Sequence, residues 1–165
     1  MAVEIRAATR NDVATIHELI RALAAYERLS DQVVATEASI DSALFGTPPA
    51  AHAIVAELDG VGVGFAFYFY NFSTFLGRPG LYLEDLFVKP ELRGRGIGRA
   101  LLGELARIAV TRGCGRMEWS VLDWNAPSIA FYRGLGAEPL SDWTTFRLTG
   151  AALTELARTP SIGTS

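Results

Sequence analysis

The sequence predicts an α/β fold in a single domain, and three observations carry this prediction. Apolar stretches with strand character alternate with segments whose apolar residues recur at helical spacing. Near the middle, a strand over residues 86–88 is followed by a glycine-rich turn and an amphipathic segment. The length of 165 residues suits one ordinary domain with a sizeable core. We therefore expect one domain over residues 1–158 and a frayed tail over residues 159–165.

The N-terminal part is expected to contain one strand and two helices. Val3–Ala7 has the composition of a strand. Thr9 to Asp12 resembles a helix cap, although Asp12 stands where a full capping box has Glu or Gln. A second helix should begin after Thr36 and end at Gly46, because prolines follow at positions 48 and 49. The first helix is indicated by apolar residues at helical spacing: Val13, Ile16, Ile20, Leu23 and Ala24.

The central part is expected to form a hairpin and a further strand. Residues 53–58 and the long aromatic stretch 61–72 both have strand character, and Asp59-Gly60 between them is a hairpin turn signal. Another strand over residues 81–88 is stopped by Pro90.

The C-terminal half is expected to begin with a helix and to alternate after it. Ile97, Leu101, Leu105 and Ile108 share one helical face, and this helix should end near Gly113. The later elements are then a strand over 117–122, a short helix over 128–133, a strand over 143–148 and one or two helical turns over 151–156.

The turn Arg93-Gly94-Arg95-Gly96-Ile97-Gly98 is the most informative stretch of the chain. Its three alternate glycines remove the side chains that would keep a ligand away from the backbone. The amides of such a turn and the first unpaired N–H groups of the helix form a concave anion site. Arg93, Arg95 and Arg99 add positive charge, so we expect a ligand that carries phosphate.

Two common nucleotide-binding motifs are excluded here. The last glycine of a dinucleotide fingerprint would fall on Arg99 or on Leu101, and the Gly-Lys-Ser/Thr end of a Walker A loop is absent from the sequence. The remaining pattern is Arg-x-x-Gly-x-Gly, with Arg93, Gly96 and Gly98 as its fixed positions. For so short a motif, the alternative interpretation is a basic helix start with flexible glycines.

Composition narrows the range of partners. The net charge of −3 argues against nucleic acid and anionic membranes, and the longest apolar run, 62–69, is too short to span a bilayer. No secretory signal opens the chain, and the single cysteine, Cys114, excludes an intrachain disulfide, so we expect a cytoplasmic protein. His17 and His52 lack metal-ligand spacing, so no metal is expected.

Longer motifs on both sides of the turn resemble one family. They are Tyr26-Glu27 with Asp31-Gln32-Val33, then Tyr82-Leu83-Glu84-Asp85-Leu86-Phe87-Val88, and Trp124-Asn125-x-Pro127-Ser128-Ile129-x-Phe131-Tyr132. Together with the Arg-x-x-Gly-x-Gly turn they resemble the GNAT superfamily, and within it the spermidine/spermine (diamine) N-acetyltransferase family, over nearly the whole chain. Residues 29–33 and 121–125 look more like the thialysine N-acetyltransferase branch, which acts on small lysine-like amines. The resemblance implies the GNAT fold, a mixed, mostly antiparallel twisted sheet of about seven strands with helices on both faces.

The resemblance implies acetyl-CoA as co-substrate. Its amide arm would lie along Leu86, Phe87 and Val88 like an added strand, and one of these N–H groups would polarise the thioester carbonyl. The alternative is that these three residues only form a core strand. Asn125 and Ser128 would contact the other arm, although Asn125 is equally suited to cap a helix. The pyrophosphate would lie on the turn and on Arg93, Gly94, Arg95, Gly96, Ile97, Gly98 and Arg99.

The resemblance also suggests the catalytic residues. Tyr132 would contact the cofactor and protonate the departing thiolate, since a phenol has a pKa of about 10 and a thiol about 8.5. Glu84 would take the proton of the amine, through water, and would lie in the substrate channel. Taken alone, Tyr132 could be a core aromatic, and Glu84 and Asp85 could be solvated strand residues.

The resemblance places Tyr26 and Glu27 against the substrate, although they also suit a helix end with an exposed carboxylate. Polyamine enzymes have an acidic segment before the last strand, where this chain has Thr144, which argues against a long cationic substrate. We expect a homodimer and direct attack by a small-molecule primary amine, which is a diamine, a polyamine or a lysine-like amine, in a ternary complex. Cys114 is expected to be a packing residue. The alternatives are a non-catalytic acyl-CoA-binding domain and an enzyme that acts on protein amines.

Overall fold

A computed structural model describes residues 2–162, and the chain divides into two compact units. The first unit runs to Leu122 and holds the sheet, while the second begins at Asp123. Each unit is described by itself.

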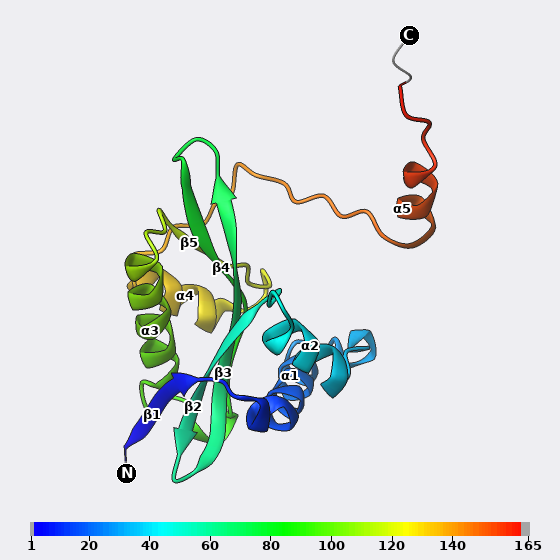
Figure 1. The fold of residues 1–165 in the computed structure, drawn as a ribbon. Helices are drawn as coiled ribbons and strands as arrows, with labels where there is room; N and C mark the ends of the chain where they lie inside the picture. The colour runs from blue at the N-terminus through cyan, green and yellow to red at the C-terminus, as the bar shows by residue number, and fades with distance from the viewer. Residues whose placement is uncertain (1, 163–165) are drawn as a thin grey trace. The chain divides into compact units, whose positions relative to one another are not determined.

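The sheet of the first unit has five strands, in the order β1-β2-β3-β4-β5. Neighbouring strands run antiparallel except β4 and β5, which are parallel. The long hairpin of β3 and β4 is the centre of the sheet (Figure 1). The strands are β1 Val3–Ala7, β2 His52–Leu58, β3 Val61–Ser73, β4 Arg78–Val88 and β5 Met117–Glu118.

Helices cover both faces of this sheet, as expected (Figure 1). Helices α1, Val13–Tyr26, and α2, Glu37–Phe45, pack on one face, where Ile16 and Leu19 join a core with Phe65 and Phe87. Helix α3, Ile97–Thr111, packs on the other face, and its Leu101 and Leu105 are fully buried. Three short 3-10 helices connect these elements: η1 Arg10–Asp12, η2 Ser30–Gln32 and η3 Pro90–Leu92.

The second unit contains α4, Ala126–Gly134, and α5, Gly150–Ala157. The Asn125 side chain caps α4, because its Oδ1 accepts the Ser128 N–H at 3.3 Å. Both helices lie where the sequence predicted them, within two residues at each end. Of the expected frayed tail, residues 163–165 lie outside the described residues.

The strand count differs from the expected seven. The strand expected over 117–122 is only two residues long, since it pairs with β4 only at Met117 and Glu118 and then leaves it. Residues 143–148 form no strand either. A strand needs a hydrogen-bonded partner strand, and among the described residues no strand pairs with residues 143–148, where Phe146 is 92% exposed.

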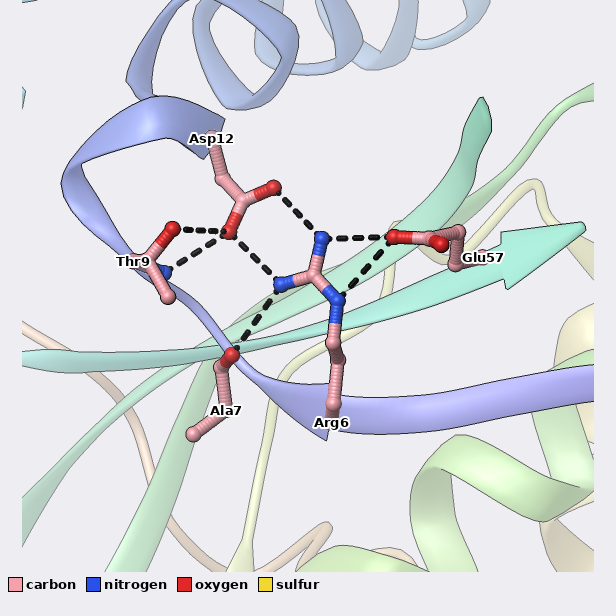
Figure 2. A network of polar contacts seen from close by, with 5 residues as sticks. All are labelled: Arg6, Ala7, Thr9, Asp12 and Glu57. Atoms are coloured by element: carbon pink, nitrogen blue, oxygen red, sulfur yellow. Dashed lines mark hydrogen bonds and ion pairs between the residues drawn. The ribbon is translucent and has the colours of Figure 1, made fainter. Parts of the chain in front are cut away.

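A charged network fixes the start of α1 to the sheet (Figure 2). The Arg6 guanidinium on β1 donates to both oxygens of Asp12 at 2.8 Å and to Oε2 of Glu57 on β2 at 2.7 Å. Asp12 also accepts the backbone N–H of Thr9 at 2.7 Å, so the cap that the sequence indicated does form. The hydrogen bond from Arg6 holds the pKa of the buried Asp12 below its usual value.

Candidate functional site

The glycine-rich turn keeps its backbone open for a ligand. Gly94 and Gly96 have φ of 78° and 80°, a left-handed conformation that favours glycine. Gly96 is the N-cap of α3 and supplies no capping side chain, so the first N–H groups of the helix face outward. A Cβ built on Gly94, Gly96 or Gly98 would meet no heavy atom within 4 Å. The turn is therefore shaped to receive an anion, with the exposed Arg95 and Arg99 beside it.

Arg93 takes a different place from its two neighbours in the motif. Its guanidinium lies over the Tyr26 ring, 4.5 Å from the centroid, and 5.4 Å from the centroid of Phe87. Its Nε donates to the backbone carbonyl of Val88 at 3.2 Å. The turn's first arginine thus joins the end of α1 to the end of β4.

Strand β4 has an open edge just before this turn. Its only pairing with β5 lies at Leu81 and Tyr82, so among the described residues no strand covers this edge farther along. Lys89 donates its N–H to Val63 on β3, and hydrogen bonds in antiparallel pairs alternate by residue. The main-chain groups of Leu86 and Val88 therefore point to the open edge, and those of Phe87 point to β3. An extended ligand can pair with this edge as an added strand.

A β-bulge in β4 sets the direction of two acidic side chains. Asp85 lies opposite Phe67 and Leu83 lies opposite Tyr68, so Glu84 is the extra residue of the bulge. Glu84 is exposed, whereas Asp85 is half-buried. Burial, together with the carboxylates of Glu84 and Glu27, raises the pKa of Asp85 to about 6.

The end of α1 brings a third carboxylate to the same place. The helix closes with Leu29 donating its N–H to the carbonyl of Ala24, with Arg28 in the left-handed region at a φ of 61°. This turn presents Tyr26 and Glu27, and burial raises the pKa of Glu27. Asp85 interacts electrostatically with both Glu84 and Glu27, and these three carboxylates are called the acidic cluster below. Such a cluster attracts a cation.

Asp85 is the member of the cluster that sequence reasoning missed. Simple strand alternation puts Glu84 and Asp85 on opposite faces, and the resemblance singled out Glu84 alone. The bulge that exposes Glu84 and half-buries Asp85 leaves no signature in the sequence. The signal that could have found Asp85 is its position two residues before Phe87, on the face that α1 covers.

We expect Asp85→Asn to stabilise the protein in a pH-dependent way. The ordinary pKa of an aspartate is about 3.9, and the folded value is higher, so ionisation of Asp85 costs stability as the pH rises from about 4 through 6. The variant should gain about 2 kcal/mol in free energy of unfolding at pH 8 and little at pH 4. Urea unfolding at both pH values measures this, with the exposed Asp31→Asn as control. An equal gain at both pH values would rule out burial of the charge.

The remaining expected site residues belong to the second unit. Asn125 and Ser128 form the cap of α4, which is the alternative role that the sequence offered for Asn125. Tyr132 lies on the same helix, half-buried, with its ring centroid 5.7 Å from that of Phe131. The first unit holds the other expected site residues, which are Tyr26, Glu27, Glu84, Leu86, Phe87, Val88 and the glycine-rich turn.

The described residues offer neither a metal centre nor a membrane-spanning helix. No group of three or more His, Cys, Asp or Glu side chains in residues 2–162 is arranged to hold a metal ion. In the same range, no helix is long and apolar enough to cross a membrane.

Comparisons with known proteins relate the chain to one family. The model of the acetyltransferase (GNAT) family matches residues 14–137. A thialysine N-epsilon-acetyltransferase of Bos taurus is 42% identical over 166 residues, covering 94% of this chain and 97% of the relative. The L-ornithine N5-acetyltransferase of Arabidopsis thaliana is 34% identical, with 90% and 85% covered. Among solved structures, an integron cassette protein of V. cholerae superimposes with a TM-score of 0.79 at 29% identity, covering 96% of this chain and 99% of the other.

Proposed function

The chain belongs to the acetyltransferase (GNAT) family, and from this membership we propose that it transfers the acetyl group of acetyl-CoA to a primary amine of a small molecule. The observation that carries the proposal is the sequence of features along β4. An acidic cluster at the bulge, an open strand edge and an open glycine turn follow one another within residues 84–98. The acidic cluster suits a cationic amine, the open strand edge suits the amide-bearing arm of the cofactor, and the glycine turn suits its pyrophosphate.

The cofactor is held mainly by backbone groups. Its amide arm pairs with the outward N–H and C=O of Leu86 and the N–H of Val88, and one of these donors polarises the thioester carbonyl. The pyrophosphate lies on the amides from Gly94 to Arg99, where the helix dipole and the arginines favour negative charge. We assign Asn125 and Ser128 to the other arm of the cofactor because their motif resembles that of the family.

The acceptor amine binds at the acidic cluster. Glu27 and Asp85 attract its ammonium form beside Tyr26, and Glu84 takes the proton through a water molecule. The nitrogen lone pair then attacks the thioester carbon, the C–N bond forms and the C–S bond breaks. Tyr132 donates its proton to the departing thiolate.

The relatives narrow the class of amine. Proteins named for thialysine and for L-ornithine match most of the chain, and both compounds are amino acids with a side-chain amine. This chain has Thr144 at the place where the polyamine enzymes of the family that it resembles have an acidic segment. We therefore propose a lysine-like amine rather than a long polyamine. Because these relatives are N-acetyltransferases, a non-catalytic acyl-CoA-binding domain is not favoured. Assays with small amines and a lysine-containing peptide distinguish the proposed enzyme from one that acts on protein amines.

The proposed direct attack predicts the kinetic pattern. If both substrates are bound together, double-reciprocal plots of rate against acetyl-CoA concentration, taken at several amine concentrations, should give intersecting lines. Cys114→Ala should retain a kcat near that of wild type. Parallel lines together with a large loss in Cys114→Ala would instead identify an acyl-cysteine intermediate. Cys114 is half-buried just after α3.

We also propose a cytoplasmic homodimer. A cytoplasmic location is supported by the single unpaired cysteine. A dimer is supported by the tip of the β3–β4 hairpin, where Phe72, Phe75 and Leu76 are exposed. Light scattering that finds a monomer at micromolar concentration would contradict the dimer.

A further inference from the structure

We propose that Arg93 is a positioning residue that locks the amine-binding end of α1 to the cofactor-binding edge of β4. This inference rests on the proposed function. It replaces the role that the motif suggested for Arg93, which was direct contact with the pyrophosphate.

Three contacts of one guanidinium carry the proposal. The group lies over the Tyr26 ring at 4.5 Å, over the Phe87 ring at 5.4 Å, and donates Nε–H to the Val88 carbonyl at 3.2 Å. Tyr26 is the last residue of α1, and Phe87 and Val88 end β4. One side chain from the start of the turn therefore contacts both halves of the proposed site.

The contact with Val88 also defines which main-chain groups remain for the cofactor. Because the Val88 carbonyl already accepts the Arg93 Nε–H, a ligand strand finds the N–H of Val88 and both groups of Leu86 on the open edge. Losing Arg93 removes none of these three groups. Its loss should therefore disturb the amine half of the site more than the cofactor half.

The end of α1 combines an unfavourable backbone conformation with a partly exposed ring. It closes on Arg28 in the left-handed region, which is unfavourable for a residue with a Cβ, and Tyr26 is more than a third exposed. A stacked guanidinium that bridges to the sheet limits the positions that Tyr26 and the neighbouring Glu27 can take. Lysine would keep the charge but not the planar stacking surface or the Nε geometry.

Steady-state kinetics of Arg93→Gln and Arg93→Lys test the inference. We expect the KM for the amine to rise about tenfold in both variants, while the Kd for CoA, measured by calorimetry, changes less than about threefold. Arg95→Gln is the matched control, because Arg95 is an exposed arginine of the same turn and has no hydrogen bond or ion pair within residues 2–162. This variant should bind CoA more weakly and leave the KM for the amine unchanged.

Amide hydrogen exchange gives a second readout that needs no turnover. The N–H groups of Glu27, Arg28 and Leu29 bond within the end of α1 and should exchange about tenfold faster in Arg93→Gln than in wild type or Arg95→Gln. Unchanged exchange, or a tenfold loss of CoA affinity with a normal amine KM, overturns the proposal. If wild type acetylates no amine, the proposed function fails, while the exchange rates still decide whether Arg93 positions α1.

Discussion

Tyr132→Phe is expected to lower kcat by about a hundredfold to ten-thousandfold while CoA affinity stays near wild type. In the proposed mechanism the hydroxyl acts only when the carbon–sulfur bond breaks, and a group that acts in the transition state affects kcat rather than binding. The substitution keeps the ring and its 5.7 Å contact with Phe131 on α4. A pH–rate series with an active amine, together with calorimetry of CoA, measures both quantities.

Glu84→Gln is the informative comparison in the same series. A lost base should be partly rescued at high pH, because more of the amine is then already neutral. A lost acid should not be rescued in this way. If Tyr132→Phe retains nearly full kcat but binds CoA more weakly, the tyrosine is a cofactor-packing residue and protonation of the thiolate belongs to solvent or another group.

Gly96→Val is expected to weaken CoA binding by about a hundredfold, the effect of losing one or two charge-assisted hydrogen bonds. The new Cβ would enter space that is empty in the protein, directly over the backbone where the pyrophosphate is proposed to lie. Calorimetry with CoA on the folded variant measures this loss. Unchanged affinity would remove the phosphate site from the turn.

A second glycine separates this effect from backbone strain. Gly113 ends α3 with a φ of 74°, close to the 80° of Gly96, and a Cβ there also meets no heavy atom within 4 Å. Gly113→Val and Gly96→Val should therefore lose similar stability, about 1–3 kcal/mol. Only Gly96→Val should lose CoA affinity, because Gly113 lies at the opposite end of the helix.

Local sequence signals predicted the first unit well. These signals act between residues that are close in the sequence: the Asp59-Gly60 turn, the apolar spacing of α1 and α3, and the prolines after α2 and β4. The helices and strands that they predict begin and end at nearly the same residues in the structure. The strands expected over 117–122 and 143–148 were wrong in length or absent. Strands depend on distant partners, and sequence propensity does not specify which edge a strand will find.

The site shows the same division between local and long-range information. The turn from Gly94 to Gly98 could be predicted from the sequence, because its left-handed backbone conformation favours glycine at Gly94 and Gly96. The half-buried Asp85 follows from a bulge against β3, and the stacking of Arg93 on Tyr26 joins residues 67 positions apart in sequence. These features arise from tertiary contacts, which a local sequence motif does not encode.

The central claim is that this chain acetylates a small, lysine-like amine with acetyl-CoA. The most direct measurement is thiol release from acetyl-CoA with a panel of thialysine, lysine, ornithine, spermidine and a lysine-containing peptide, with the product identified by mass spectrometry. We expect amine-dependent thiol release and a mono-acetylated product with at least one of the three amino acids, in larger amount than with spermidine or the peptide. CoA binding without amine-dependent thiol release would identify a binding domain, and acetylation of the peptide alone would identify an enzyme for protein amines. Either result would contradict the proposed function.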